Sequence, residues 1–182
     1  MPALVQIPRV LSGNIRFFRE GAPYTRPTSG ICGQNAKPDG DDPAYIDLGP
    51  IEDGELEFSG GTDYEIWRPS PGRLLLWDVI TTKEKWTLRF TALEMSPLAI
   101  EALFRAGSNL SSLSGQFNPM AGSIRKGWLH AQLYDQDDNL VLTFDNWCRL
   151  KCTGGFRLGE IVKPTFEALM LYSQHNTALI GS

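Results

Sequence analysis

The feature that most constrains the fold of this chain is a period-two alternation of apolar and polar residues. In "EKWTLRFTALE", one face of an extended chain would carry the apolar side chains Trp86, Leu88, Phe90 and Ala92. Alternation of this kind is typical of a strand that is buried on one face. The stretch "GELEF" repeats the pattern, and "GNIRFFRE" near the start predicts a further strand.

Three more segments predict strands. The run "GWLHAQLYDQDDNLVLTFDNWCRLKC" predicts a hairpin, with strands over residues 128–135 and 140–152 joined by a polar turn. Residues 73–80, "RLLLWDVI", are apolar on both faces until Asp78. Such a strand indicates burial between layers or between subunits. Near the C-terminus, "KPTFEALMLYS" allows a helix or a strand, and the β-rich context favours a strand.

One helix is predicted. Ser96 is a suitable N-cap and Pro97 suits the first helical position, and "LAIEALF" then continues until Gly107 offers a stop. The expected fold class is therefore all-β, a β-sandwich or barrel with one short helix and long loops. A length of 182 residues is typical of one domain, so residues 1–182 are predicted to form a single domain.

Two segments, residues 21–43 and 106–122, are rich in glycine, proline and polar residues and show no periodicity. Loops of this length in a compact domain are usually functional or mobile. We expect both loops to lack a fixed structure in the free chain, and we expect short arms at the two termini.

The composition is that of a chain with a substantial core, since 42% of the residues are apolar. No apolar run approaches the roughly 18 residues of a membrane span, so no membrane partner is expected. The start, "MPALVQIPRVLSG", lacks a cationic region followed by an apolar stretch. We therefore expect synthesis in the cytoplasm without secretion.

The three cysteines are Cys32, Cys148 and Cys152. On one strand, Cys148 and Cys152 would lie about 13 Å apart at roughly 3.3 Å per residue. A disulfide needs Cα atoms within about 7 Å, so this pair would not close. Only two histidines accompany the cysteines, which gives a zinc site little support. We expect buried, reduced thiols.

The charges are distributed unevenly along the chain. Ten acidic residues and no basic residue lie between Asp39 and Glu65, whereas the rest of the chain has 11 acidic and 17 basic residues. The net charge of −4 thus combines a local −10 with +6 elsewhere. Such asymmetry indicates a charged partner or field. A solvated face with a flexible loop is the alternative explanation.

Motifs of catalysis are missing from the sequence: it has no nucleophile elbow, dinucleotide-binding glycine motif or phosphate loop. The stretch "DQDDN" has the look of a calcium loop, but Leu140 and Asn146 stand where glycine and glutamate are needed, which favours a hairpin turn. We expect His130 to be a packed or interfacial residue rather than a general base. We expect Glu55 and Glu57 to be solvated strand neighbours rather than an acid–base pair. No catalytic, cofactor or metal site is predicted.

Two runs within residues 45–107 carry a family pattern, "DLGPIEDGELEF" and "EIWRPSPGRLLLWDVITTKEKWTLRFTALEMSPLAIEALFRAG". They combine an "LG" step into an acidic strand, a hairpin, an alternating strand and a short helix. In this order the features resemble the tail tube (major tail) proteins of long-tailed bacteriophages. The resemblance covers about a third of the chain.

This resemblance implies a β-sandwich with a flanking helix. Six copies would form a ring, and stacked rings would form a tube through which double-stranded DNA passes without specific binding. The partners implied are other copies of the chain and tail proteins such as the tape measure, terminator and distal tail proteins. The location implied is the virion, and the long loops would become ordered between rings.

The resemblance also suggests roles for particular residues. Glu55 and Glu57 are the candidate lumen wall, because carboxylates repel the phosphates that a basic wall would retain. Alternatively, these acidic residues meet basic residues of a neighbouring subunit. The candidate inter-subunit contacts are Tyr64, Trp67, Arg68, Leu75, Trp77 and Phe117.

Other functions remain open at this point. A tail terminator or connector ring protein would share the fold but stop after one ring. A monomeric β-sandwich module that binds a ligand would gather its exposed aromatic residues in one groove. A hydrolase is the remaining alternative.

Overall fold

The computed structural model describes residues 12–59, 63–81, 85–104, 125–135, 137–153 and 163–180. The predicted loop at 106–122, with its candidate contact Phe117, lies outside the described residues, as does the N-terminal arm before residue 12. The strands are β1 (Ser12–Arg19), β2 (Pro23–Tyr24), β3 (Gly30–Ile31), β4 (Ile46–Ser59), β5 (Asp63–Ser70), β6 (Arg73–Thr81), β7 (Lys85–Ala92), β8 (Arg125–Tyr134), β9 (Leu140–Cys152), β10 (Thr165–Met170) and β11 (Thr177–Ile180). The helix is α1 (Pro97–Phe104).

The main sheet is an antiparallel barrel. Its strands follow the order β10-β7-β4-β1-β8-β9, and β10 also pairs with β9, which closes six strands into a ring. Strand β11 adds to the same edge of β9, beyond the end of β10. The fold class predicted from the sequence, all-β with one short helix, is confirmed. So are the strand at "KPTFEALMLYS" and the β8–β9 hairpin.

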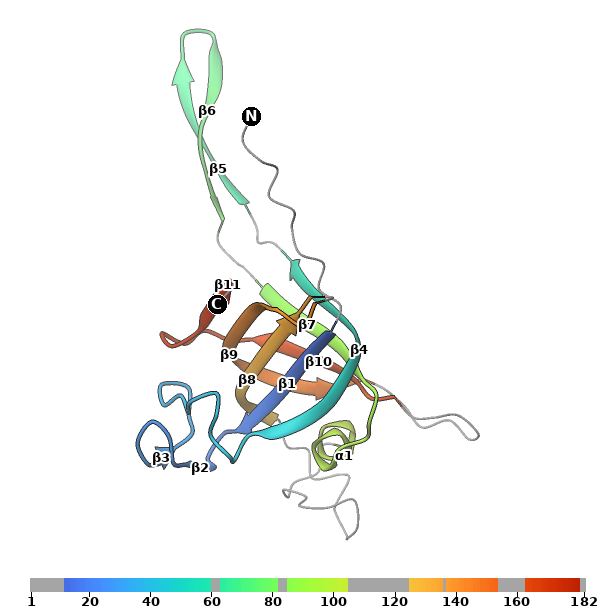
Figure 1. Ribbon diagram of the computed structural model, residues 1–182. Coiled ribbons are helices and arrows are strands. Elements are labelled where there is room, and N and C mark those ends of the chain that lie inside the picture. The colour runs from blue at the N-terminus through green and yellow to red at the C-terminus, as the bar shows by residue number, and fades with distance from the viewer. Residues whose placement is uncertain are drawn as a thin grey trace.

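The interior of the barrel holds the main apolar core. Phe17, Phe90 and Phe166 belong to it, and Phe90 stacks on Phe166 with ring centroids 5.1 Å apart. Helix α1 contributes Leu98 and Ala102 to the same core, at the end of the barrel away from the β5–β6 hairpin (Figure 1). The helix therefore closes one end of the barrel.

The start of α1 follows the sequence prediction. Ser96 accepts a hydrogen bond through its Oγ from the backbone N–H of Ala99, at 3.2 Å, and the helix begins at Pro97. This side chain satisfies one of the amide groups that have no partner within the helix. The N-cap and the first helical residue are thus as predicted.

A buried carboxylate on α1 was not anticipated from the sequence. Glu101 is fully buried, with Arg19 Nη2 2.5 Å from its Oε1 and Arg125 Nε 3.4 Å from its Oε2. Burial lowers the pKa of Arg19, although Glu101 opposes that shift. Because a buried charge needs a partner, this cluster fixes the helix against β1 and β8.

The loop over residues 21–43 folds against the outside of the barrel. A second apolar cluster lies beneath it, made of Phe18, Cys32, Tyr45, Trp128 and Trp147. The indole N–H of Trp128 donates to the carbonyl oxygen of Gly33 at 2.9 Å. The expectation that this loop lacks a fixed structure is therefore wrong. The loop packs on aromatic side chains that the alternating pattern of the strands places on the outer face of the barrel.

Asp42 organises the ends of this loop. Its carboxylate is buried and accepts hydrogen bonds from the backbone N–H groups of Thr25, Arg26 and Ala44 at 2.7–2.9 Å. The hydroxyl of Thr25 adds a fourth, at 3.0 Å. Burial alone would raise the pKa of Asp42, but these hydrogen bonds outweigh it and lower the pKa.

The cysteines are buried thiols, as predicted. Cys148 and Cys152 both lie on β9, four residues apart. Burial raises the pKa of Cys32 to about 12 and raises that of Cys148 as well. In the described part of the chain, no helix is long and apolar enough to cross a bilayer.

Candidate assembly surface

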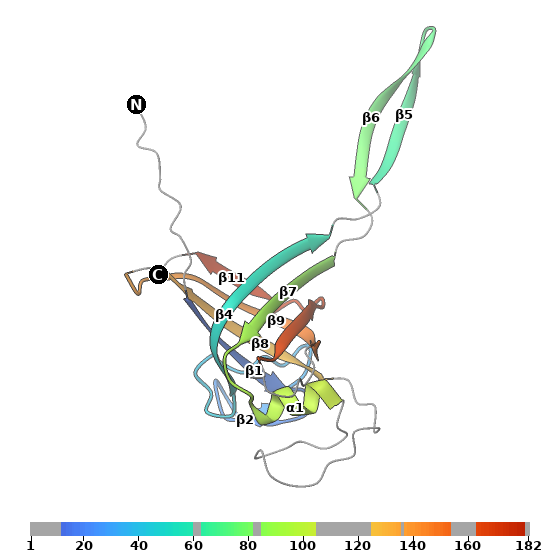
Figure 2. The same cartoon turned by 90° about the vertical axis from the view of Figure 1, so that its right-hand side faces the viewer.

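Strands β5 and β6 form a hairpin that stands away from the barrel. They pair only with each other among the described strands, in a two-stranded sheet separate from the barrel. Both views show the hairpin projecting beyond the ends of β4 and β7 (Figure 1, Figure 2). A two-stranded hairpin is at best marginally stable alone in water. Packing against another surface would therefore stabilise this hairpin.

The hairpin is apolar on both faces. Along β6, Leu74 and Leu76 point to one face and Leu75 and Trp77 to the other, since side chains alternate in a strand. Leu74 is 64% exposed and Trp77 is 61% exposed. The large apolar side chains exposed on the hairpin are Tyr64, Ile66, Trp67, Leu74, Leu75, Leu76, Trp77, Val79 and Ile80. The sequence predicted burial of β6 between layers or between subunits. The first prediction is wrong, because the side chains of β6 are exposed within its own chain.

Contacts within the hairpin give it a defined shape. The guanidinium carbon of Arg68 lies 3.7 Å from the centre of the Trp77 ring. The indole N–H of Trp67 donates to the Glu65 carboxylate at 3.1 Å. A register shift between Ile66 and Trp67 marks a bulge, which twists the ribbon. The predicted contact residues Tyr64, Trp67, Arg68, Leu75 and Trp77 all lie on this one hairpin.

The predicted lumen residues lie on β4, beside β7. The register places Glu55 opposite Arg89 and Glu57 opposite Thr87. Arg89 Nη1 lies 2.7 Å from Glu57 Oε2, and its Nε lies 3.8 Å from Glu167 Oε2. The side chain of Glu55 lies outside the described residues. The charge of Glu57 is thus partly balanced within its own chain.

Residues of β7, β9, β10 and β11 surround a hollow beside the end of β10. Strand β10 pairs with β7 over Thr87–Thr91 and ends at Met170. An apolar pocket of about 490 Å³ lies there, hereafter the mouth pocket. Its lining includes Trp86, Leu142, Phe144, Met170, Tyr172 and Ala178.

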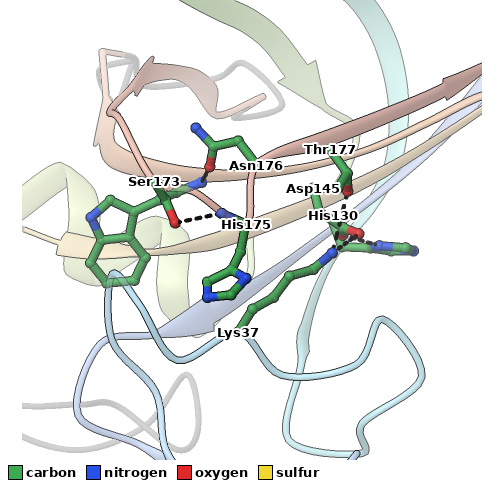
Figure 3. Close-up of polar contacts among 8 residues, drawn as sticks. Lys37, His130, Asp145, Ser173, His175, Asn176 and Thr177 are labelled. Carbon is green, nitrogen blue, oxygen red and sulfur yellow. Dashed lines mark hydrogen bonds and ion pairs between the residues drawn. The ribbon is translucent and has the colours of Figure 1, made fainter.

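His130 belongs to a polar group on the outside of the barrel (Figure 3). Its Nδ1 lies 2.6 Å from Asp145 Oδ1, and Lys37 Nζ donates to Asp145 Oδ2 at 2.7 Å and to Thr177 Oγ1 at 3.3 Å. Burial would raise the pKa of Asp145, but hydrogen bonds from His130 and Lys37 lower it. A Cβ on Gly40 would meet His130 Cε1 at 2.6 Å, so the loop backbone covers the ring.

This arrangement indicates a structural role for His130, because a covered ring gives no substrate access. The group joins the 21–43 loop through Lys37 to strands β8, β9 and β11. His130 is a packed residue, as expected from the sequence. The ion pair between Lys37 and Asp145, the partner of His130, was missed because Lys37 and Asp145 lie 108 residues apart in the sequence.

Comparisons with known proteins give few matches. No protein-family model matches the sequence, and no curated protein matches it. Among solved structures, the chain is similar to a chain in the cryo-EM structure of the anti-feeding prophage (AFP) baseplate, 6-fold symmetrised. The two share 13% sequence identity with a TM-score of 0.38, over 98% of this chain and 96% of the other. A likeness at this level does not assign a function.

Proposed function

We propose that this protein is a structural subunit of a bacteriophage tail, which assembles with copies of itself into rings that stack as a tail tube. The observation that carries the proposal is the projecting β5–β6 hairpin with two exposed apolar faces. A subunit built for assembly needs such surface, whereas a protein that works alone does not.

The size of the apolar surface supports self-association. At on the order of 100 Å² for each large side chain that is about half exposed, the hairpin presents roughly 900 Å². The largest apolar patch on a typical monomer is about 300–600 Å². A stable protein–protein interface buries about 800 Å² on each partner. This area is divided between the two opposite faces of the hairpin, so the two faces together match one partner's share of a stable interface and each face carries about half of it.

The edges of the strands support the same conclusion. From Ile51 to Ser59, β4 pairs with β7 on one side only among the described strands. An open edge of this length is a template for pairing with another chain. The barrel is closed by its own strands, so among the described surfaces the edge of β4 and the hairpin are two that a partner would cover.

The stoichiometry of six and the passage of DNA follow from the sequence resemblance to tail tube proteins. In such a tube Glu55 and Glu57 would face the lumen and keep the wall free of strong phosphate contacts. The tape measure, terminator and distal tail proteins would be further partners in the virion. The role proposed is structural rather than catalytic.

The test uses charge on the hairpin. The double variant Leu75→Glu and Trp77→Glu should leave the monomer folded, because both side chains are exposed, but it should abolish assembly. Ile31→Glu is the matched control, since Ile31 is 60% exposed on a different hairpin. Sedimentation velocity of the full chain measures the outcome. If the wild type stays monomeric at high concentration, the proposal is wrong.

A further inference from the structure

We infer that the two ends of the β8–β9 hairpin join copies of this chain, and that the acidic turn of one copy binds a basic groove at the other end of the hairpin in the next copy. The inference rests on the proposed function and names the surfaces through which rings would stack. The acidic turn joins β8 to β9 and carries Asp135, Asp137 and Asp138. The basic groove is lined by Arg149, Lys151, Glu167 and Leu169.

The basic groove lies on the outer face of the barrel, where β9 and β10 pair. Its volume of about 110 Å³ is below the roughly 300–1,000 Å³ of small-molecule pockets, so it suits a single side chain. Arg149 and Lys151 are exposed, and in the described part of the chain neither has an ion-pair partner. The register places Lys126 of β8 beside Arg149, which adds a third positive charge.

The groove also contains one carboxylate, that of Glu167. Arg89 Nε lies 3.8 Å from Glu167 Oε2, and Arg89 Nη1 lies 2.7 Å from Glu57 Oε2. Arg89 therefore offsets part of the negative charge on this face. Together with the three cations beside the groove, it gives four positive charges against two carboxylates. The surface around the groove keeps a net positive charge.

The acidic turn has a fixed backbone and free carboxylates. The Asp135 carboxylate accepts hydrogen bonds from the backbone N–H groups of Asn139 and Asp137, at 2.9 and 2.8 Å, and these bonds lower its pKa. Asp138 has a φ of 59°, in the left-handed region that aspartate tolerates. Asp137 and Asp138 are exposed, and among the described residues neither has a cationic partner. An ordered turn of this kind loses little conformational entropy on binding.

The acidic turn and the basic groove do not meet within one chain. From Lys126 to Tyr134, β8 extends about 26 Å at roughly 3.3 Å per residue, and the turn lies beyond that end. The basic end is the one that α1 closes, because Arg125, next to Lys126, reaches Glu101 of the helix. A contact between the two surfaces therefore has to join two copies.

A second copy is the occupant that the charges favour. The turn and the groove are different parts of one chain, so their contact is heterologous and repeats from one copy to the next. Repetition along the hairpin builds a stack, as the proposed tube requires. The charges also fix a head-to-tail order, because two turns or two grooves would repel each other.

The first experiment reverses one charge at a time. Arg149→Glu and Asp137→Lys should each raise the concentration at which tubes form about tenfold at low salt, because like charges then face each other. Both effects should shrink in 1 M salt, where the screening length is about 3 Å. The combined variant should return to within about threefold of the wild type. Arg26→Glu, an exposed reversal on the 21–43 loop, is the matched control and should leave tube formation unchanged.

The second experiment locates the contact by chemical cross-linking. A carbodiimide couples a carboxylate to an amine only where the two groups touch. In assembled wild type, mass spectrometry should find Asp137 or Asp138 coupled to Lys126 or Lys151. These groups are too far apart to react within one chain, so the link identifies a contact between copies. The link should be absent when the protein is treated in 1 M salt.

Four results decide the matter. Normal tubes from both single variants, wild-type tubes without the cross-link, or a combined variant that assembles worse than either single one would overturn this inference and leave the proposed function standing. A double-stranded DNA fragment that binds the wild type but not Arg149→Glu, while tubes form equally in both, would assign the groove to phosphate instead. A wild type that never assembles would remove both the inference and the proposed function.

Discussion

The guanidinium carbon of Arg68 lies 3.7 Å from the centre of the Trp77 ring, across the two strands of the projecting hairpin. A cation–π contact at an exposed site contributes about 0.5–1 kcal/mol. The contact therefore orders the side chains of Arg68 and Trp77 within the free chain. A surface that is already ordered loses less conformational entropy on binding.

Arg68→Ala should weaken assembly without affecting the barrel. Losing the contact with Trp77 should raise the concentration for half-assembly about two- to fivefold, which corresponds to its energy. Light scattering over a concentration series measures this. Arg73→Ala removes the same charge from the same hairpin at its turn, and it should cause a smaller shift. Equal shifts for both variants would mean that net charge, not the ring contact, controls assembly.

Replacing Glu55 and Glu57 with lysine tests the proposed lumen. Arg89 would lose its carboxylate partner at Glu57, at a cost of about 0.2–1 kcal/mol because the pair is exposed. Tails should still form, but DNA ejection should slow, most strongly at low salt. Ejection rates from particles carrying the variant give the measurement. Asp39→Lys, at an exposed position of the 21–43 loop, is the control for added positive charge.

Two outcomes of that experiment would contradict the assignment. Normal tails with normal ejection would show that Glu55 and Glu57 do not line the conduit. Missing tails would show instead that the two carboxylates contact a neighbouring subunit.

Asp42→Asn should destabilise the protein by roughly 1–3 kcal/mol, since an amide cannot accept the same set of hydrogen bonds from a buried position. Urea unfolding measures the loss. In this variant, the amide protons of residues 21–43 should also exchange faster than in the wild type. Asp41→Asn is the matched control, because Asp41 is exposed and only pairs with Arg26. The idea fails if both variants lose the same stability.

The effect of Asp42 should depend on pH in a defined direction. Its pKa is lowered in the folded protein, so its contribution is complete above the ordinary carboxyl value of about 3.9. The contribution disappears as the pH falls through the lower, folded value. The stability difference between wild type and Asp42→Asn should therefore be constant from pH 7 to 5 and shrink below pH 4. A difference that grows on acidification would contradict this account.

The cysteines should be unreactive in the native protein. The pKa of Cys32 is raised to about 12 and that of Cys148 is also raised, so neither forms much thiolate at pH 8. A thiol reagent should react slowly with the folded chain and should titrate three thiols after unfolding under non-reducing conditions. Fewer than three would indicate a disulfide and would be inconsistent with the positions of Cys148 and Cys152 on β9.

Local patterns in the sequence predicted much of the barrel. Alternation around Leu88 and Phe90 identified β7, and the polar turn between β8 and β9 identified their hairpin. Closure of the barrel was not predictable in detail, because it needs β10 to pair with β7 as well as with its neighbour β9, and β7 and β10 are far apart in the sequence. The choice between sandwich and barrel depends on β10 making both pairings.

Contacts between segments that are distant in the sequence were missed for the same reason. A sequence shows that Trp128 and Trp147 are apolar, but not that the irregular 21–43 loop covers them. Likewise, the composition of β6 predicted burial, but composition cannot say whether the cover comes from the same chain or from another. The predicted contact residues on β5 and β6 lie close together because these two strands are consecutive in the sequence. The mouth pocket was missed because four separate strands build it.

The central claim is that copies of this chain assemble through the β5–β6 hairpin, and cryo-electron microscopy of the purified full chain at high concentration tests it most directly. The account predicts rings of six copies, alone or stacked, in which the hairpin of each copy is buried against a neighbour. It also predicts that the Leu75→Glu and Trp77→Glu double variant shows only monomers on the same grids. Rings in which the hairpin remains exposed to solvent, or a wild type that shows only monomers, would contradict it.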